Sequence, residues 1–205
     1  MLTRTPTEIL PRLWLSGLYT AVDEEQLLAI GVTHVVSVIE QRPKYPPTLK
    51  KLKTLHIPVY DIETTDLLQH LDVTTAFIKS ALDDKHNTVL VHCAMGISRS
   101  ATVLAAYLIA TTRMQPHEAI EFLQSKREIV CPNLSFRRQL DVYAARLHRS
   151  RKLRKFLPPP LRRPAASYLP HAPLAADGIR LLRTSQSPRV SHPPPVAMTR
   201  RGSMG

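Results

Sequence analysis

The chain has 205 residues, of which 43% are hydrophobic, and this suits one domain with a sizeable core. Its two cysteines, Cys93 and Cys131, exclude a disulfide framework and a zinc site built on three or four thiolates. The net charge of +12 is concentrated in residues 151–205, which carry 11 Lys and Arg against one acidic residue, while residues 1–150 carry 17 against 15.

The first half of the chain predicts strands that alternate with helices. Short apolar runs, two of them rich in β-branched residues, predict strands at 13–15, 34–39 and 55–59. Asp23 stands where it can cap a helix, with Gln26 three positions later as in a capping box, and Gly31 ends that helix. Apolar residues at helical spacing predict a further helix over 67–82.

The second half predicts one more strand, at 88–91, followed by a block of helices. These helices cover 100–110, 115–126 and 134–148, with 149–155 as an extension of the last one before proline ends it. Pro116 fits the first turn of its helix, where a missing N–H costs nothing. Strands followed by a helical block indicate an α/β protein in which helices cover a sheet.

Residues 1–150 form the predicted globular domain, and residues 151–205 form a predicted disordered tail. The tail holds 10 of the 18 prolines and few large apolar side chains, so it cannot offset the entropy of ordering. Its arginines suit an acidic partner, a nucleic acid or a membrane surface, and the simpler alternative is a solvated extension. Arg162 and Arg163 also resemble part of a nuclear-import patch.

The N-terminal ten residues contain no apolar leader, and the chain has no run of 18 apolar residues. Neither a secretory signal nor a transmembrane helix is therefore expected. A reactive thiol suits a reducing compartment, so we expect an intracellular protein of the cytoplasm or nucleus, acting as a monomer.

The most informative stretch is residues 92–100, which read His-Cys-Ala-Met-Gly-Ile-Ser-Arg-Ser. A predicted strand leads into this loop and a predicted helix leads out, which directs loop amides and a helix N-terminus toward one point. Both effects favour the thiolate of Cys93, and Arg99 can hold two phosphate oxygens at once. The loop predicts phosphoryl transfer through a covalent cysteine intermediate. The alternative is a buried thiol with a surface arginine.

This stretch resembles the signature of the cysteine-based protein phosphatases, which has His92 and Cys93, then five residues, then Arg99 and Ser100. The five intervening residues resemble those of the dual-specificity subgroup. The resemblance covers nearly all of residues 5–148 and implies a small central mixed sheet flanked by helices. It places around the phosphate the loop residues Ala94, Met95, Gly96, Ile97, Ser98 and Arg99.

Within this family, residues 61–71 together with Phe77 and Ile78 are most similar to the yeast-type members that carry a C-terminal zinc module. The tail of this chain lacks the cysteines that such a module needs. Functions that depend on the module, ribosome maturation among them, are therefore not expected.

The resemblance also implies roles for the residues of the loop. Cys93 is the expected nucleophile and Arg99 the phosphate clamp, while Ser100 stabilises the thiolate as it leaves. A helix N-cap is the alternative role for Ser100, because serine is favoured there. His92 is expected to support the loop by hydrogen bonding, and the alternative is a surface histidine.

A phosphatase of this kind needs a general acid from a separate loop to protonate the leaving oxygen. Asp61 follows the predicted strand at 55–59 and matches the acid position of the family. Asp66 is the alternative, although its place before the helix at 67–82 favours a capping role. Glu63 is expected to be a solvated loop charge.

The turn before the last helix carries three further predictions. Asn133 is expected to cap that helix and Phe136 to enter the core. Cys131 is expected to be a structural thiol, and the alternative is a protective disulfide with Cys93.

No stretch resembles the tyrosine-recognition loop of the strictly tyrosine-specific phosphatases. The resemblance therefore implies a shallow pocket that admits phosphotyrosine, phosphoserine and phosphothreonine of phosphoprotein substrates. Ala94, Met95 and Ile97 carry no positive charge, which disfavours the alternatives of a phosphoinositide or an RNA 5′-phosphate. No cofactor and no metal are expected, because Arg99 and the loop amides supply the positive charge. A binding module that turns over poorly is the remaining alternative.

Overall fold

The computed structural model describes residues 5–156, and for residues 153–156 it describes the backbone helix alone. Five strands form one mixed sheet in the order β1-β2-β5-β3-β4. Their bounds are Thr7–Leu10 for β1, Leu13–Ser16 for β2, His34–Val38 for β3, Lys53–Ile57 for β4 and Val89–His92 for β5. All neighbours pair in parallel except β1, which runs antiparallel to β2. The predicted α/β class with a small mixed sheet is confirmed.

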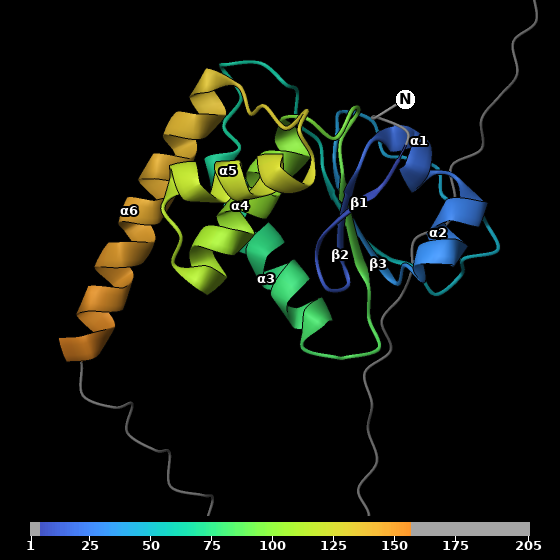
Figure 1. Ribbon diagram of the computed structural model, residues 1–205, viewed down its shortest axis with the longest axis horizontal. Helices are drawn as coiled ribbons and strands as arrows, with labels where there is room; N and C mark the ends of the chain where they lie inside the picture. The colour runs from blue at the N-terminus through green and yellow to red at the C-terminus, as the bar shows by residue number, and fades with distance from the viewer. Residues whose placement is uncertain (1–4, 157–205) are drawn as a thin grey trace, which may run out of the picture. The chain divides into compact units, whose positions relative to one another are not determined.

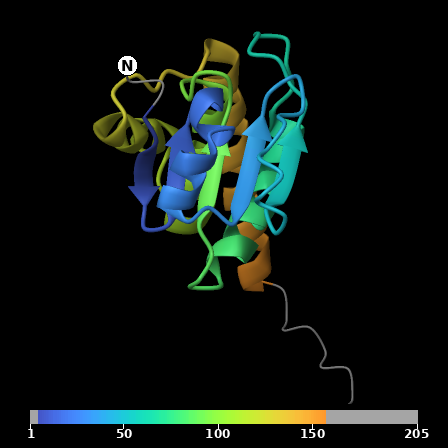
Figure 2. The same ribbon diagram turned by 90° about the vertical axis from the view of Figure 1, so that its right-hand side faces the viewer.

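Helices cover both faces of this sheet (Figures 1 and 2). One face carries α1 (Leu18–Ala21) and α2 (Glu24–Ile30), and the other carries α3 (Leu71–Leu82), α4 (Arg99–Thr112), α5 (Pro116–Lys126) and α6 (Leu134–Phe156). Val35 and Leu90 join the core under α1 and α2, whereas Val36, Val89 and Val91 join the larger core under the other helices. Burial on both faces explains why the central strands are almost entirely apolar.

The helix α4 lies at the centre of the helical layer. Every residue from Arg99 through Ile109 is buried, because α3, α5 and α6 all pack against this helix. A helix that is enclosed on all sides needs apolar or small residues all round, as the sequence of α4 has. The sheet and α4 together hold the 92–100 loop from both ends.

Three predicted helix ends, both ends of α2 and the start of α5, are confirmed. The Asp23 carboxylate accepts the Gln26 N–H at 3.0 Å, and Gly31 ends α2 with a left-handed φ of 72°. Pro116 is the first residue of α5. The N–H of the preceding residue, Gln115, donates to the Glu118 carboxylate at 2.6 Å. These ends form as predicted because their signals are local.

Two predicted elements differ from the structure. The strand at 55–59 lies two residues earlier, because Pro58 cannot donate to the ladder. The predicted helix at 67–82 begins as a 3₁₀ turn, Leu68–His70, before α3. Its first amides, of Leu67 and Leu68, donate to the Gln139 side chain of α6 at 2.8 Å each, so a distant helix sets how this segment starts.

The helix α6 continues to Phe156, so the predicted extension over 149–155 is helical. The rest of the predicted tail, including Arg162 and Arg163, lies outside the described residues. Within residues 5–156, no helix is long and apolar enough to span a bilayer.

Candidate active site

Three neighbouring parallel strands each deliver a polar side chain just beyond their carboxyl ends. Glu40 follows β3, Asp61 follows β4 and Cys93 follows β5. The carboxyl ends of parallel strands lie at one edge of the sheet, which is where open α/β sheets bind their ligands. The 92–100 loop therefore meets two acidic residues that are distant in sequence.

The thiol of Cys93 lies at the base of the loop and is only 2% exposed. Its Sγ accepts the Gly96 N–H at 3.3 Å and the Ser100 hydroxyl at 3.1 Å. Burial raises the pKa of Cys93, but hydrogen bonds from Ser100 and Ile97 and the charge of Arg99 outweigh it and bring the pKa below its ordinary value. The site favours a thiolate, which is the nucleophilic form.

Gly96 allows the loop to close tightly. Its φ is 69°, and a Cβ at this position would lie 2.6 Å from the backbone oxygen of Ser16. A side chain would therefore meet both a strained backbone and rigid neighbouring backbone atoms. Glycine is the residue that lets this amide turn toward Cys93.

The guanidinium of Arg99 is buried beside the loop and is held at one nitrogen. Its Nη1 donates to the backbone oxygen of Val59 at 3.1 Å and to the carboxylate of Glu40 at 2.9 Å. Burial raises the pKa of Glu40, but its own backbone amide and Arg99 outweigh this and hold the pKa below its ordinary value. Within residues 5–152, the Nε of Arg99 has no hydrogen-bond acceptor, and a phosphate oxygen would supply one.

Asp61 is the second acidic residue beside this guanidinium. Its Oδ2 lies 3.6 Å from the Arg99 Nε, while its Oδ1 accepts the Ser98 hydroxyl at 2.8 Å and the Asn133 amide at 2.9 Å. Asn133 also accepts the Phe136 N–H at 2.9 Å, so it caps α6 as predicted. One asparagine thus links the start of α6 to the Asp61 carboxylate.

His92 supports the loop from within the sheet. Its Nδ1 donates to the Cys93 carbonyl at 3.2 Å, so its Nε2 accepts from the Ser37 hydroxyl at 2.9 Å, and Tyr45 hydrogen-bonds to Ser37. Burial lowers the pKa of His92 to about 4, against a smaller opposite effect of its bond to Cys93. The imidazole is therefore neutral near pH 7, and its hydrogen bonds join the start of the loop to β3.

The structure decides between several alternatives for the predicted residues. Ser98, rather than Ser100, precedes the first residue of α4, so the capping role for Ser100 is wrong. Asp66 accepts the Gln69 N–H at 3.3 Å at the 3₁₀ turn, away from the loop. Cys131 is an exposed free thiol, and Phe136 is fully buried in the core.

Two contributors to the site were not predicted. Glu40 carries no local signal, because it precedes an irregular segment between β3 and β4. Arg127, just after α5, donates through Nε to the Gly96 carbonyl at 3.1 Å and through Nη2 to the Met95 carbonyl at 3.4 Å. Arg127 thus holds the outward carbonyls of the loop while the amide of Gly96 faces Cys93.

Residues 13–146 match the family model of the dual specificity phosphatase catalytic domain. The chain belongs to the dual-specificity phosphatase family. Over 147 residues it is 38% identical to mouse dual specificity protein phosphatase 13B, covering 69% of this chain and 74% of that protein. It is also 38% identical to human dual specificity protein phosphatase 1 over 135 residues, 66% of this chain but only 36% of that longer protein.

Solved dual-specificity phosphatases share the fold. A mouse protein crystallised with zinc tungstate has a TM-score of 0.67 at 31% identity, covering 72% of this chain and 91% of that one. The phosphatase domain of Yvh1 from Chaetomium thermophilum has a TM-score of 0.61 at 30% identity, covering 66% and 91% respectively. As a member of this family, the chain is a protein phosphatase, as the 92–100 loop predicts.

Proposed function

We propose that this dual-specificity phosphatase hydrolyses phosphotyrosine, phosphoserine and phosphothreonine of proteins through a phosphorylated Cys93. The observation that carries this proposal is the buried Sγ, which receives hydrogen bonds from Gly96 and Ser100 and lies near the guanidinium of Arg99. A nucleophile in its anionic form and a cation for the phosphate are the two groups that such a reaction requires.

In the first step, the Cys93 thiolate forms a bond to phosphorus while the bond from phosphorus to the substrate oxygen breaks. Asp61 gives its proton to that leaving oxygen, and Arg99 holds the equatorial phosphoryl oxygens. In the second step, water attacks phosphorus and loses a proton to Asp61, and the bond from sulfur to phosphorus breaks. Ser100, already bonded to Sγ, stabilises the returning thiolate.

Matched phosphopeptides test this function. We expect the wild-type chain to release phosphate from peptides that differ only in carrying phosphotyrosine or phosphothreonine, with Cys93 as the residue labelled during turnover. The reaction should be inhibited by vanadate and unaffected by chelators, because the positive charge comes from protein groups. No phosphate release from either peptide, or abolition of activity by a chelator, would contradict the proposal.

The Asp61→Asn variant tests the general acid. We expect kcat for a phosphoserine peptide to fall by about 10²- to 10⁴-fold, because an alkoxide leaves poorly without a proton. For para-nitrophenyl phosphate, whose leaving group needs little help, the loss should be much smaller. The alkaline limb of the pH–rate profile, where a general acid loses its proton, should flatten in this variant.

Asp66→Asn is the matched control for that variant. The same change there removes a negative charge and leaves an oxygen that can still accept the Gln69 N–H, so kcat should stay near the wild-type value. If Asp66→Asn lost the activity and Asp61→Asn retained it, the acid would be Asp66.

The walls of the loop favour a protein substrate over a phosphoinositide or an RNA end. Ala94, Met95 and Ile97 bring no cation to the loop, and Met95 is 46% exposed at its surface. The similar mouse protein was crystallised with zinc tungstate, and tungstate has the tetrahedral shape of phosphate. We also propose that the protein acts as a monomer in the cytoplasm or nucleus, where Cys93 stays reduced.

A further inference from the structure

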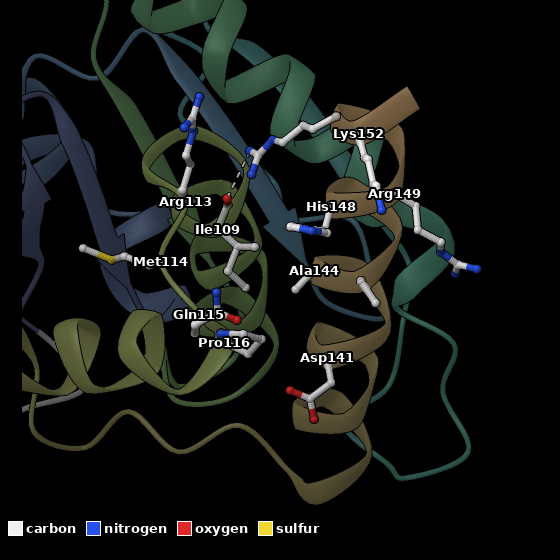
Figure 3. Close-up of a pocket in the computed structure, with 12 residues that line it drawn as sticks. Ile109, Arg113, Met114, Gln115, Pro116, Asp141, Ala144, His148, Arg149 and Lys152 are labelled. Atoms are coloured by element: carbon white, nitrogen blue, oxygen red, sulfur yellow. Dashed lines mark hydrogen bonds between the residues drawn. The ribbon is translucent and has the colours of Figure 1, made fainter. Parts of the chain in front are cut away.

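A second hollow lies away from the phosphate loop, between the end of α4, the start of α5 and the last turns of α6 (Figure 3). Its volume is about 950 Å³. Ile109 and Pro116 are buried on one side, and Ala144 and His148 of α6 point toward them from the other. The floor of the hollow is thus apolar, although Ile109 itself is only 2% exposed.

The rim of this hollow is strongly basic. Arg113, His148, Arg149 and Lys152 line it, and Asp141 is its one acidic residue. Within residues 5–152, the side chains of these four basic residues make no ion pair or hydrogen bond. Cations that are left without partners around an apolar floor complement an acidic segment that carries an apolar side chain.

The shape of the hollow is held by a fifth cation that is already engaged. Arg151 donates to the carbonyl oxygens of Ala110 at 2.5 Å and Ile109 at 3.4 Å, at the end of α4. This contact joins α6 to α4 and satisfies carbonyls that the helix end leaves free. The walls are therefore fixed relative to each other, while the rim cations stay available.

We propose that this basic groove, defined by Ile109, Arg113, Pro116, Ala144, His148 and Lys152, docks an acidic segment of the phosphoprotein substrate. The proposal rests on the proposed phosphatase function. The chain's own tail fits poorly, because the seven arginines of residues 157–205, against one acidic residue, would add repulsion. A nucleic acid also fits poorly, since no Phe, Tyr or Trp lines the groove for base stacking.

The helix α4 sets the distance between the two sites. It starts at Arg99 in the phosphate loop, and its 14 residues span about 21 Å to the groove. An extended peptide covers about 3.3 Å per residue, so at least about six residues are needed to span the distance between the two sites. A linker of about ten residues allows the peptide to follow the curved surface. The acidic segment is therefore expected roughly ten residues from the phosphorylated one.

A phosphopeptide series on the full chain tests the groove. Each peptide carries the same phosphotyrosine core, with a Glu-rich segment ten residues away, the same segment two residues away, or a Gln-rich segment ten residues away. We expect KM for the first peptide to be about tenfold lower than for the other two, with kcat unchanged. The advantage should shrink at high salt, because the rim is exposed.

Charge reversal locates the effect on the protein. The double variant Arg113→Glu/Lys152→Glu should abolish the KM advantage. Two matched controls should keep it: Lys50→Glu/Lys51→Glu, on exposed lysines outside the groove, and Arg162→Glu/Arg163→Glu in the tail. Loss of the advantage in the tail control alone, or an equal advantage at both spacings, would overturn the proposal.

Two further measurements keep the outcomes distinct. Each variant should hydrolyse para-nitrophenyl phosphate at the wild-type rate, which shows that its domain is folded. If Arg113→Glu/Lys152→Glu does not, the milder variant Arg113→Gln/Lys152→Gln takes its place in the peptide series. If wild type hydrolyses no phosphate ester, the phosphatase function fails. If it hydrolyses all three peptides with the same KM, or if an RNA oligonucleotide binds the groove and the acidic peptide does not, the docking proposal fails.

Discussion

Replacing Cys93 by serine is expected to abolish turnover while leaving phosphate binding intact. A serine hydroxyl is not ionised near pH 7, so it lacks the anion that the hydrogen bonds of Gly96 and Ser100 stabilise here. We expect kcat to fall by at least about 10⁴-fold. Arg99 and the loop amides remain, so Cys93→Ser should retain a phosphopeptide in a pull-down while wild type releases it dephosphorylated.

Cys131 provides the matched control for the nucleophile. It is exposed and free, so Cys131→Ser should keep wild-type kcat, in contrast to Cys93→Ser. Turnover that survives in Cys93→Ser, or that is lost in Cys131→Ser alone, would place the nucleophile elsewhere.

The same background allows the Cys93 thiol to be titrated. In Cys131→Ser, we expect iodoacetamide to react with Cys93 at pH values below the ordinary thiol pKa, because the net effect of the loop is to lower that pKa. Ser100→Ala removes one stabilising hydrogen bond, so its alkylation profile should shift to higher pH. Tungstate should protect the thiol by occupying the loop.

Replacing Arg99 by lysine is expected to have the second-largest effect. Lysine keeps the charge but has a single nitrogen, whereas the guanidinium binds Glu40 and Val59 through Nη1 and still has an Nε, 3.6 Å from Asp61, without a hydrogen-bond acceptor among residues 5–152. We expect kcat to fall by about 10²- to 10³-fold, as for the loss of one donor to a transition state. Steady-state kinetics with a phosphotyrosine peptide measure this loss.

Arg12→Lys controls for the loss of a half-buried guanidinium. The Arg12 guanidinium donates to the carbonyls of Leu82, Asp84 and Asn87, beside the turn between β1 and β2. The same substitution there should lower thermal stability and leave kcat of the folded protein unchanged. A wild-type kcat/KM in Arg99→Lys would rule out the phosphate clamp.

The helical caps and the phosphate loop are predictable because their determinants are close together in the chain. Gly96 has to be glycine for its left-handed φ, and Cys93 and Arg99 lie in one nine-residue stretch, so no long-range contact is needed to recognise them. The strand β1, which forms a hairpin with β2, was not predicted. The turn of this hairpin depends on Arg12, whose φ of 66° is stabilised by carbonyls about 70 residues away.

The choice of partners around the loop depends on the tertiary structure. Glu40 and Asp61 both reach Arg99 because the parallel register of β3, β4 and β5 brings the ends of these strands to one edge of the sheet. Asn133 reaches Asp61 because α6 packs against α4. Sequence alone left Ser100 between a helix cap and a thiol partner, and the fold decides for the thiol. The amino-acid sequence by itself determines which reactive groups the site contains, since a thiol, a guanidinium or a glycine's left-handed φ belongs to a single residue. The hydrogen-bond and ion-pair partners of these groups are determined by the packing of distant segments, which no local pattern encodes.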